Sequence, residues 1–324
     1  MIIITGGVGF IGSILAWKLN ELGRKDLLIV DQDAKNSPKW NNLKKHGFDS
    51  YLESGEFLTR LEKGEFNGKV DAVFHMGACS STTEMDKAYL RENNSLYSER
   101  IARWCIDQKV YLSYASSAAT YGAGEQGFSD EDALTPKLKP LNPYGQSKLD
   151  FDIWVLKNGL EKKVTGFRFF NVYGPNEYHK SSMRSMVHKG FEQIQSTGKI
   201  KLFKSYKKEY PDGGQRRDFV YVKDVIDAMI WFWHNPEKKG IYNLGSGKAQ
   251  SWNELAEAMF QSCRKKKNIE YIEMPDSIKN QYQYFTEADL KKFSTAGCPT
   301  VFLNLAHGTA DYVHNYLSKK DPYL

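Results

Sequence analysis

The sequence predicts an α/β fold in which a doubly wound parallel sheet carries a smaller α/β lobe. Three observations lead to this prediction. Short apolar runs alternate with amphipathic segments through the first half of the chain. A glycine-rich turn, TGGVGFIG, joins the first apolar run to the first amphipathic segment, and Asp31 ends the second apolar run. Alternating β and α units favour a parallel sheet with right-handed crossovers.

The length of each apolar run and the spacing of its apolar residues predict whether it forms a strand or a helix. Buried strands are expected at residues 2–5, 27–30, 72–75, 111–115 and 164–169, with helices at 10–22, 88–107 and 144–156. Further strands are expected at 199–203, 218–222 and 241–244, and further helices at 224–233 and 252–263, before a looser tail. A first domain is expected over 1–172 plus about 218–246, and a smaller lobe over about 173–217 and 247–324.

Composition narrows the class of protein. The 324 residues are 41% apolar and 26% charged, as in ordinary globular proteins. The net charge of +6 suits a small anionic ligand, and the single tight basic run, 264–267, is predicted to be a solvated helix end and not a nucleic-acid site. The four cysteines form no CxxC and no zinc-like cluster with histidine, so reduced thiols and no metal site are expected.

No apolar run approaches the ~18 residues of a membrane span. The chain enters a strand at once with MIIITGG, which leaves no room for a signal peptide. A cytoplasmic protein with no membrane partner is therefore expected.

The glycine-rich turn indicates a dinucleotide site of the Rossmann type. Gly7, Gly9 and Gly12 form GxGxxG, and Gly6, Gly9 and Gly12 form the related GxxGxxG. Such glycines let backbone N–H groups approach a pyrophosphate at a helix N-terminus. The alternative is a glycine-rich turn without a ligand. Asp31 alone favours NAD, whereas Lys35 and Lys39 could neutralise the 2′-phosphate of NADP.

Tyr144 and Lys148 form the strongest chemical motif, in NPYGQSK. Residues i and i+4 share one helix face, where a lysine ammonium can lower the pKa of a phenol. Ser116 and Ser117, in YASSAATYG, offer a hydroxyl for a reacting oxygen. This combination suits removal of a proton from an alcohol while a hydride leaves its carbon. Alternatively, each residue is structural: a buried aromatic, a surface lysine and a strand end.

These motifs resemble the extended short-chain dehydrogenase/reductase family, whose members modify nucleotide sugars. The resemblance runs nearly end to end and includes HMGACSSTTE, RFFNVYGPNE and RDFVYVKDV. Within the family the chain is most similar to the branch that epimerises ADP-linked heptose, through GACSSTT, FNVYGPNEYHKSSM, KLFKS, IYNLGSG and YQYFTEADL. The resemblance implies inversion at C6″ of the heptose used in lipopolysaccharide. It also implies tightly held NADP, ahead of NAD, and a homo-oligomer with a homopentamer as the expected assembly.

The resemblance also assigns residues. Tyr144 and Lys180 would be the two acid/base groups, Lys148 would bind the nicotinamide ribose, and Ser117 would hold the reacting oxygen. Besides Tyr144 and Lys148, the expected cofactor contacts are Gly6, Gly7, Gly9, Phe10, Ile11, Gly12, Asp31, Gln32, Lys39, Met76, Gly77, Ala78, Cys79, Ser80, Asn93 and Val172. The expected substrate contacts are Ser80, Asn171, Ser182, Lys189, Phe203, Lys204, Ser205, Arg217 and Tyr282.

Arg217 is expected to clamp the diphosphate, with an ion pair to Asp218 as the alternative. The chain departs from the family pattern at Met76, Gln32 and Lys189, and in a long stretch before Asp212. Three other functions remain: a UDP-sugar 4-epimerase, a nucleotide-sugar dehydratase and a cofactor-sensing regulator. Ala118 and Ala119 stand where related dehydratases carry an Asp–Glu pair, which argues against dehydration.

Overall fold

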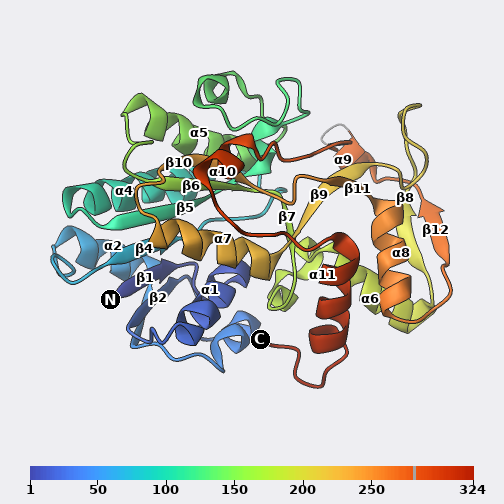
Figure 1. Cartoon of the computed structure of the whole chain (residues 1–324), viewed down its shortest axis with the longest axis horizontal. Helices are drawn as coiled ribbons and strands as arrows, with labels where there is room; N and C mark the ends of the chain where they lie inside the picture. The colour runs from blue at the N-terminus through green and yellow to red at the C-terminus, as the bar shows by residue number, and fades with distance from the viewer. Residues whose placement is uncertain (280–281) are drawn as a thin grey trace.

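The computed structural model describes residues 1–279 and 282–324. A seven-stranded sheet forms its centre, in the order β10-β6-β5-β4-β1-β2-β3, and every pairing in it is parallel (Figure 1). Its strands are β1 (Ile2–Thr5), β2 (Leu27–Asp31), β3 (Ser50–Glu53), β4 (Ala72–His75), β5 (Tyr111–Ser117), β6 (Thr165–Phe169) and β10 (Gly240–Leu244). The predicted doubly wound parallel sheet is confirmed.

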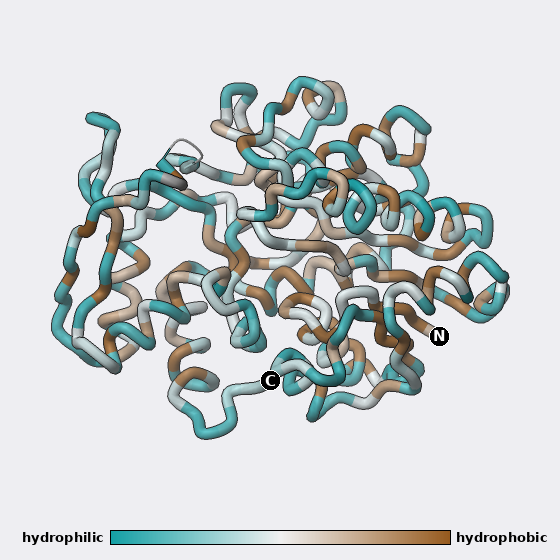
Figure 2. The backbone as a smooth tube through the Cα atoms, turned by 180° about the vertical axis from the view of Figure 1, so that it is seen from behind, coloured by the Kyte–Doolittle hydropathy of each residue, from teal (hydrophilic) through white to brown (hydrophobic). Residues whose placement is uncertain are grey.

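Both faces of this sheet are covered because its central strands are apolar on both sides. Ile2 and Ile4 of β1 pack on one face, against α1 (Phe10–Glu21) and α7 (Val222–His234). Ile3 points to the opposite face, toward α2 (Ser54–Glu62), α4 (Tyr97–Asp107) and α5 (Pro143–Lys157). The strands run through the middle of the molecule in Figure 2, where brown segments are frequent. The alternation of side chains along a strand thus divides one sheet into two cores.

A smaller layer of strands and helices lies beside the carboxyl ends of the sheet (Figure 1). Its strands form a three-stranded sheet, β11-β9-β7, and a parallel pair, β12-β8. The strands are β7 (Asn171–Tyr173), β8 (Ile200–Phe203), β9 (Arg216–Tyr221), β11 (Ala249–Ser251) and β12 (Ile269–Ile272). A third apolar cluster joins β8 and β9 to α6 (Met186–Thr197), α8 (Trp252–Ser262) and α11 (Leu305–Tyr312).

The remaining elements are short. They are α3 (Lys87–Leu90), α9 (Asp276–Lys279), α10 (Lys291–Ala296), the 3-10 turns η1 (Pro38–Leu43), η3 (Ala118–Tyr121), η4 (Asp132–Lys137) and η5 (Tyr178–Met183), and the π-helical turns η2 (Arg91–Leu96) and η6 (Val313–Leu317). Most predicted elements are present within two or three residues. β3 and α2 are not predicted from the sequence, because β3 buries only Leu52 and so lacks an apolar run.

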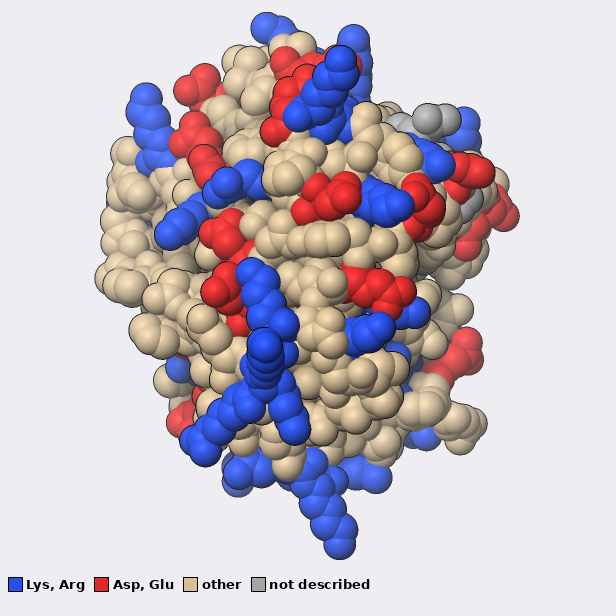
Figure 3. Space-filling view, turned by 90° about the vertical axis from the view of Figure 1, so that its right-hand side faces the viewer, with Lys and Arg blue, Asp and Glu red and all other residues tan. Residues whose placement is uncertain are grey.

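The outer face of the smaller layer is mixed in charge. Figure 3 shows acidic side chains among a band of lysines and arginines. On this layer Lys199 pairs with Glu270 and Lys267 with Glu257. Exposed pairs of this kind contribute about 0–1 kcal/mol each. Among the described residues, no helix has the length and apolar character that a membrane crossing requires.

Candidate active site

A cavity of about 520 Å³ opens at the carboxyl ends of β1, β2 and β4. The turn after β1, the end of β2 and residues 76–81 form one side, and His179, Lys180 and Met183 of η5 complete it. The predicted cofactor residues in its lining are Gly6, Gly9, Phe10, Ile11, Gly12, Asp31, Gln32, Lys39, Met76, Gly77, Ala78, Cys79, Ser80 and Asn93. Gly7, Tyr144, Lys148 and Val172 are absent from this lining. The size is that of a small-molecule site.

The glycine turn fits a dinucleotide because its backbone is too close to its neighbours for side chains. Gly6 has φ +64°, and a Cβ there would lie 2.7 Å from the backbone of Gly77. A Cβ on Gly12 would lie 2.2 Å from the Gly6 carbonyl oxygen. The bare turn directly precedes α1, so its N–H groups and the helix N-terminus are available to a pyrophosphate.

Asp31 lies at the end of β2 with both carboxylate oxygens engaged. Its Oδ2 accepts from the Val8 N–H at 2.9 Å, and its Oδ1 accepts from Lys39 Nζ at 2.8 Å. Lys39 also donates to the Gln32 carbonyl at 2.6 Å. A carboxylate that already accepts from an ammonium is a weaker acceptor for a ribose hydroxyl. Lys39 therefore brings positive charge to the position where NAD and NADP differ.

Tyr144 lies in the first turn of α5, which Asn142 caps by accepting from the Gly145 N–H at 2.7 Å. Burial raises the pKa of the Tyr144 phenol, and a hydrogen bond with Ser117 opposes that rise. In this structure the rise from desolvation outweighs the lowering that the spacing of Lys148 suggests. The Lys148 ammonium instead donates to the Ala115 carbonyl at 2.9 Å. Desolvation of the phenol dominates.

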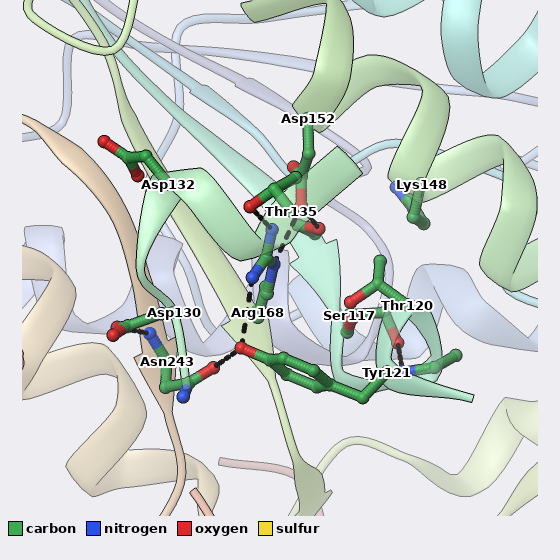
Figure 4. A network of polar contacts seen from close by, with 12 residues as sticks. Ser117, Thr120, Tyr121, Asp130, Asp132, Thr135, Lys148, Asp152, Arg168 and Asn243 are labelled. Atoms are coloured by element: carbon green, nitrogen blue, oxygen red, sulfur yellow. Dashed lines mark hydrogen bonds and ion pairs between the residues drawn. The ribbon is translucent and has the colours of Figure 1, made fainter. Parts of the chain in front are cut away.

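Ser117 and Ser116 point to different environments, because neighbouring residues of β5 face opposite sides. Ser116 Oγ donates to Asp152 at 2.9 Å, whereas Ser117 Oγ accepts from the Ala119 N–H at 3.1 Å and lies close enough to Tyr144 to affect the pKa of its phenol. Asp152 also accepts from the buried Arg168 guanidinium at 2.9 Å, and Figure 4 shows this pair beside Lys148 and Ser117. Of the two serines, the structure brings only Ser117 to the phenol.

Lys180 lies in η5, in the wall of the cavity. Its Nζ is 5.4 Å from the centre of the Phe10 ring, which belongs to the helix that follows the glycine turn. Burial lowers the pKa of Lys180, and the nearby Glu177 carboxylate opposes that change. The next residue, Ser181, has φ 49° and ψ −121°, so the backbone kinks directly after the lysine. A partly desolvated amine in a cofactor-sized cavity is suited to proton transfer.

Arg217 is a buried cation without a carboxylate partner among the described residues. It lies on β9 with 6% of its surface exposed, and burial lowers its pKa. Its guanidinium carbon is 5.0 Å from the Tyr282 ring centre and 5.9 Å from that of Trp252. The alternative ion pair is wrong, because Asp218 accepts from the N–H groups of Ser246, Gly247 and Ala288. Such a cation is suited to an anionic ligand.

The other predicted substrate residues are dispersed around Arg217 and η5. Phe203 packs edge-on against Tyr282 at 6.2 Å between ring centres. Lys204 pairs with Glu273 at 2.6 Å, and the Ser205 N–H donates to Asp212. Of the rest, Asn171 begins β7, Ser182 is exposed on η5, and Lys189 is half-buried on α6.

Several residues of the cavity lining are not predicted from the sequence. They are Asp33, Ser54, Ser81, Tyr89, Tyr97, Ala115, His179 and Met183. Ser54 belongs to the unpredicted α2, so no sequence signal pointed to it. His179 precedes Lys180 in the HKSSM run, and its proximity to a predicted base could have identified it.

Lys148 has a measurable effect on the pH dependence of stability. Burial lowers its pKa from 10.5 to about 8, so between these values the unfolded chain holds a proton that the folded chain has lost. The free energy of unfolding should therefore rise with pH from about 8 to 10.5, relative to Lys148→Met, by on the order of 3 kcal/mol. Urea unfolding of both proteins at pH 7.5, 9 and 10.5 measures this difference. A constant difference would contradict it.

The comparisons with known proteins give the family of the chain. The model of the NAD dependent epimerase/dehydratase family matches residues 2–245. The ADP-L-glycero-D-manno-heptose-6-epimerase of Nitratidesulfovibrio vulgaris strain DP4 is 47% identical over 324 residues, with both chains fully covered. The enzyme of the same name from Fusobacterium nucleatum is 45% identical, again with both chains fully covered.

A crystal structure of the Helicobacter pylori ADP-L-glycero-D-manno-heptose-6-epimerase superposes with a TM-score of 0.78 at 28% identity, covering 97% of this chain and 95% of that one. The match of the family model and the full-length relatives cover the glycine turn, Tyr144 and Lys180 alike. The chain therefore belongs to the NAD dependent epimerase/dehydratase family.

Proposed function

We propose that this chain interconverts ADP-D-glycero-D-manno-heptose and ADP-L-glycero-D-manno-heptose at C6″, in the synthesis of the heptose of the lipopolysaccharide core. The observation that carries the proposal is Lys180 in the wall of the cavity that the glycine turn also lines. If the oxygen of each epimer meets a different part of the site, each needs its own proton acceptor, and Tyr144 and Lys180 supply two. The full-length relatives that carry this name support the same reaction.

A bound nicotinamide dinucleotide supplies the reversible oxidation of C6″. Tyr144 or Lys180 takes the proton of the C6″ hydroxyl, and the other residue returns a proton to the oxygen of the opposite epimer. Ser117, which lies beside Tyr144, holds the reacting oxygen, and the Lys148 ammonium binds the nicotinamide ribose. A positioned base contributes typically ~10² to 10⁴-fold to such a step.

Arg217 is proposed to bind the diphosphate of the substrate. A guanidinium offers paired N–H donors that match phosphate oxygens, and no carboxylate among the described residues competes for this one. Arg217→Gln should raise KM for the ADP-sugar by about 10- to 100-fold, with a smaller change in kcat. The matched control is Arg216→Gln on the same strand, whose exposed guanidinium donates to the Ala249 carbonyl. Equal KM values for the two variants would contradict the proposed role.

NADP is proposed as the cofactor, on the basis of the Lys39–Asp31 pair, and the NAD-bound relatives support only the broader class. Heat release of the dinucleotide from purified protein, followed by mass measurement, distinguishes the two. A mass equal to that of NAD would overturn the choice of NADP. Three further points remain predictions from the sequence. They are a homo-oligomer, with a homopentamer expected, a cytoplasmic location, and the division into two lobes.

The decisive experiment is epimer exchange by the purified protein without added cofactor. ADP-heptose of one configuration should become a mixture of both, as followed by anion-exchange chromatography. UDP-glucose, given as a competing substrate, should remain unchanged. Conversion of UDP-glucose with inert ADP-heptose would instead favour a 4-epimerase, and loss of water from either sugar would favour a dehydratase.

A further inference from the structure

One buried side chain joins the cofactor site to the segment that carries Lys180. Asn42 lies on η1 with 1% of its surface exposed. Its Nδ2 donates to the Val8 carbonyl at 2.9 Å and to the Asn176 carbonyl at 3.0 Å. The same nitrogen lies 3.2 Å from Nδ1 of His179. The two carbonyls fix which end of the amide faces them, because only the NH₂ group donates.

These contacts join three segments that are far apart in the sequence. Val8 belongs to the glycine turn, and its own N–H donates to Asp31. Asn42 is three residues after Lys39 on η1, so the two side chains share one short element. His179 lines the cavity and directly precedes Lys180. Movement of Asn42 would therefore affect the phosphate turn, the Lys39 ammonium and the proposed base together.

Asn176 holds the other end of this connection. It has φ 70°, a conformation that asparagine adopts more readily than most side chains, and it is fully buried. Its Nδ2 donates to Ser13 Oγ on α1 at 3.1 Å, and its Oδ1 accepts from the Leu324 N–H at 3.1 Å. The carbonyl that Asn42 contacts is thus fixed from two sides.

The Asn42 amide is poorly arranged for stability alone. Its Oδ1 is buried without a hydrogen-bond partner among the described residues. A buried acceptor without a partner costs free energy, so the amide is retained for the two carbonyls that its Nδ2 satisfies, those of Val8 and Asn176. The NH₂ group of the amide makes well-formed hydrogen bonds, whereas its oxygen makes none. We therefore expect the role of this side chain to be the positioning of the groups that its NH₂ contacts.

We propose that Asn42 is a positioning residue that couples dinucleotide binding to the placement of Lys180. The proposal rests on the proposed function only where it assigns Lys180 as an acid/base group. It predicts that removal of the Asn42 amide weakens dinucleotide binding and also displaces Lys180. Asn42 itself is assigned no contact with the dinucleotide or the sugar.

The test compares Asn42→Ala with Asn41→Ala, the same residue type one position earlier on η1. Asn41 is partly exposed, and its amide makes a single 3.4 Å contact with the Tyr323 hydroxyl. Exchange of bound NADPH for added NADP, followed by fluorescence, should be about tenfold faster in Asn42→Ala and unchanged in Asn41→Ala. Asn42→Ser, which keeps a small donor, serves as the second variant if the alanine variant unfolds.

A readout on Lys180 itself completes the test and does not depend on the reaction. Acetic anhydride labels accessible amines, and mass spectrometry of the peptide with Lys180 gives the extent of labelling. NADPH should protect Lys180 in the parent protein and protect it at least threefold less in Asn42→Ala. If the parent shows no epimer exchange, the proposed function fails, yet this measurement still decides the coupling.

A double-mutant cycle with Lys180→Met separates positioning from general destabilisation. Asn42→Ala should lower kcat about tenfold in the parent and have little further effect on kcat when Lys180 is already Met. KM for the ADP-sugar should change less than threefold, because Arg217 lies outside this connection. Unchanged NADPH exchange and labelling in a folded Asn42→Ala protein, or a full additive loss in the Lys180→Met background, would overturn the proposal.

Discussion

Replacement of Tyr144 by Phe and Lys180 by Met in one chain is expected to abolish epimer exchange. Each side chain is proposed to handle the proton of one epimer, and a positioned acid or base contributes typically ~10² to 10⁴-fold. Without both side chains, only substrate binding and orientation still contribute to the rate. The double variant should therefore fall at least about 10⁴-fold in kcat, near the detection limit of a chromatographic assay. The double variant should still bind the dinucleotide through the glycine turn and Lys39.

The single variants and two controls make this result specific. Tyr144→Phe and Lys180→Met should each lose about 10²-fold or more in kcat. Tyr271→Phe and Lys199→Met remove a phenol and an amine from the exposed β8–β12 layer, and their kcat should equal that of the parent. A double variant that exchanges epimers at the parent rate would end the two-base mechanism, whatever the binding data show.

Arg168→Met is expected to be the most destabilising single substitution in the sheet. Arg168 and Asp152 are fully buried, and the guanidinium also donates to the Tyr121 hydroxyl at 3.1 Å and to Thr135 at 2.8 Å. Figure 4 shows the guanidinium enclosed by these partners, and Asn243 continues the network through Tyr121. Removal of one partner of a buried ion pair typically costs about 3–5 kcal/mol, because the other charge stays buried. Urea unfolding monitored by tryptophan fluorescence measures the change.

Two controls separate the lost pair from the lost volume. Arg168→Met combined with Asp152→Leu removes both charges and should recover most of the lost stability, because a buried pair is often replaceable by apolar groups. Arg60→Met removes an exposed arginine paired with Glu56 and Glu65, and should cost no more than about 1 kcal/mol. If Arg168→Met cost no more than Arg60→Met, the network would not be a stabilising element.

Local chemistry made much of the fold predictable. Apolar runs such as Ile2–Thr5 and Leu27–Asp31 have apolar side chains on both faces of the strand. Both faces must be covered by helices, which is typical of a parallel sheet. The glycine turn and the acid at the end of β2 are likewise short-range requirements of one βαβ unit. β3 and α2 escaped prediction, β3 because its signal is weak. β3 is a half-exposed edge strand, and its register depends on β2 and not on its own pattern.

By itself, the sequence determined which chemical groups are present and which of them are neighbours along one helix or turn: the bare glycine turn, and Tyr144 four residues before Lys148. Only the tertiary structure decided how distant groups meet and what surrounds them. It brought Lys180 to the Phe10 ring, left Arg217 without a carboxylate partner in the described part of the chain and placed Ser117, and not Ser116, beside the Tyr144 phenol. It also raised the pKa of Tyr144, against the expectation from spacing. Desolvation and pairing depend on every element packed around a group, and that information is absent from the spacing of residues along the chain.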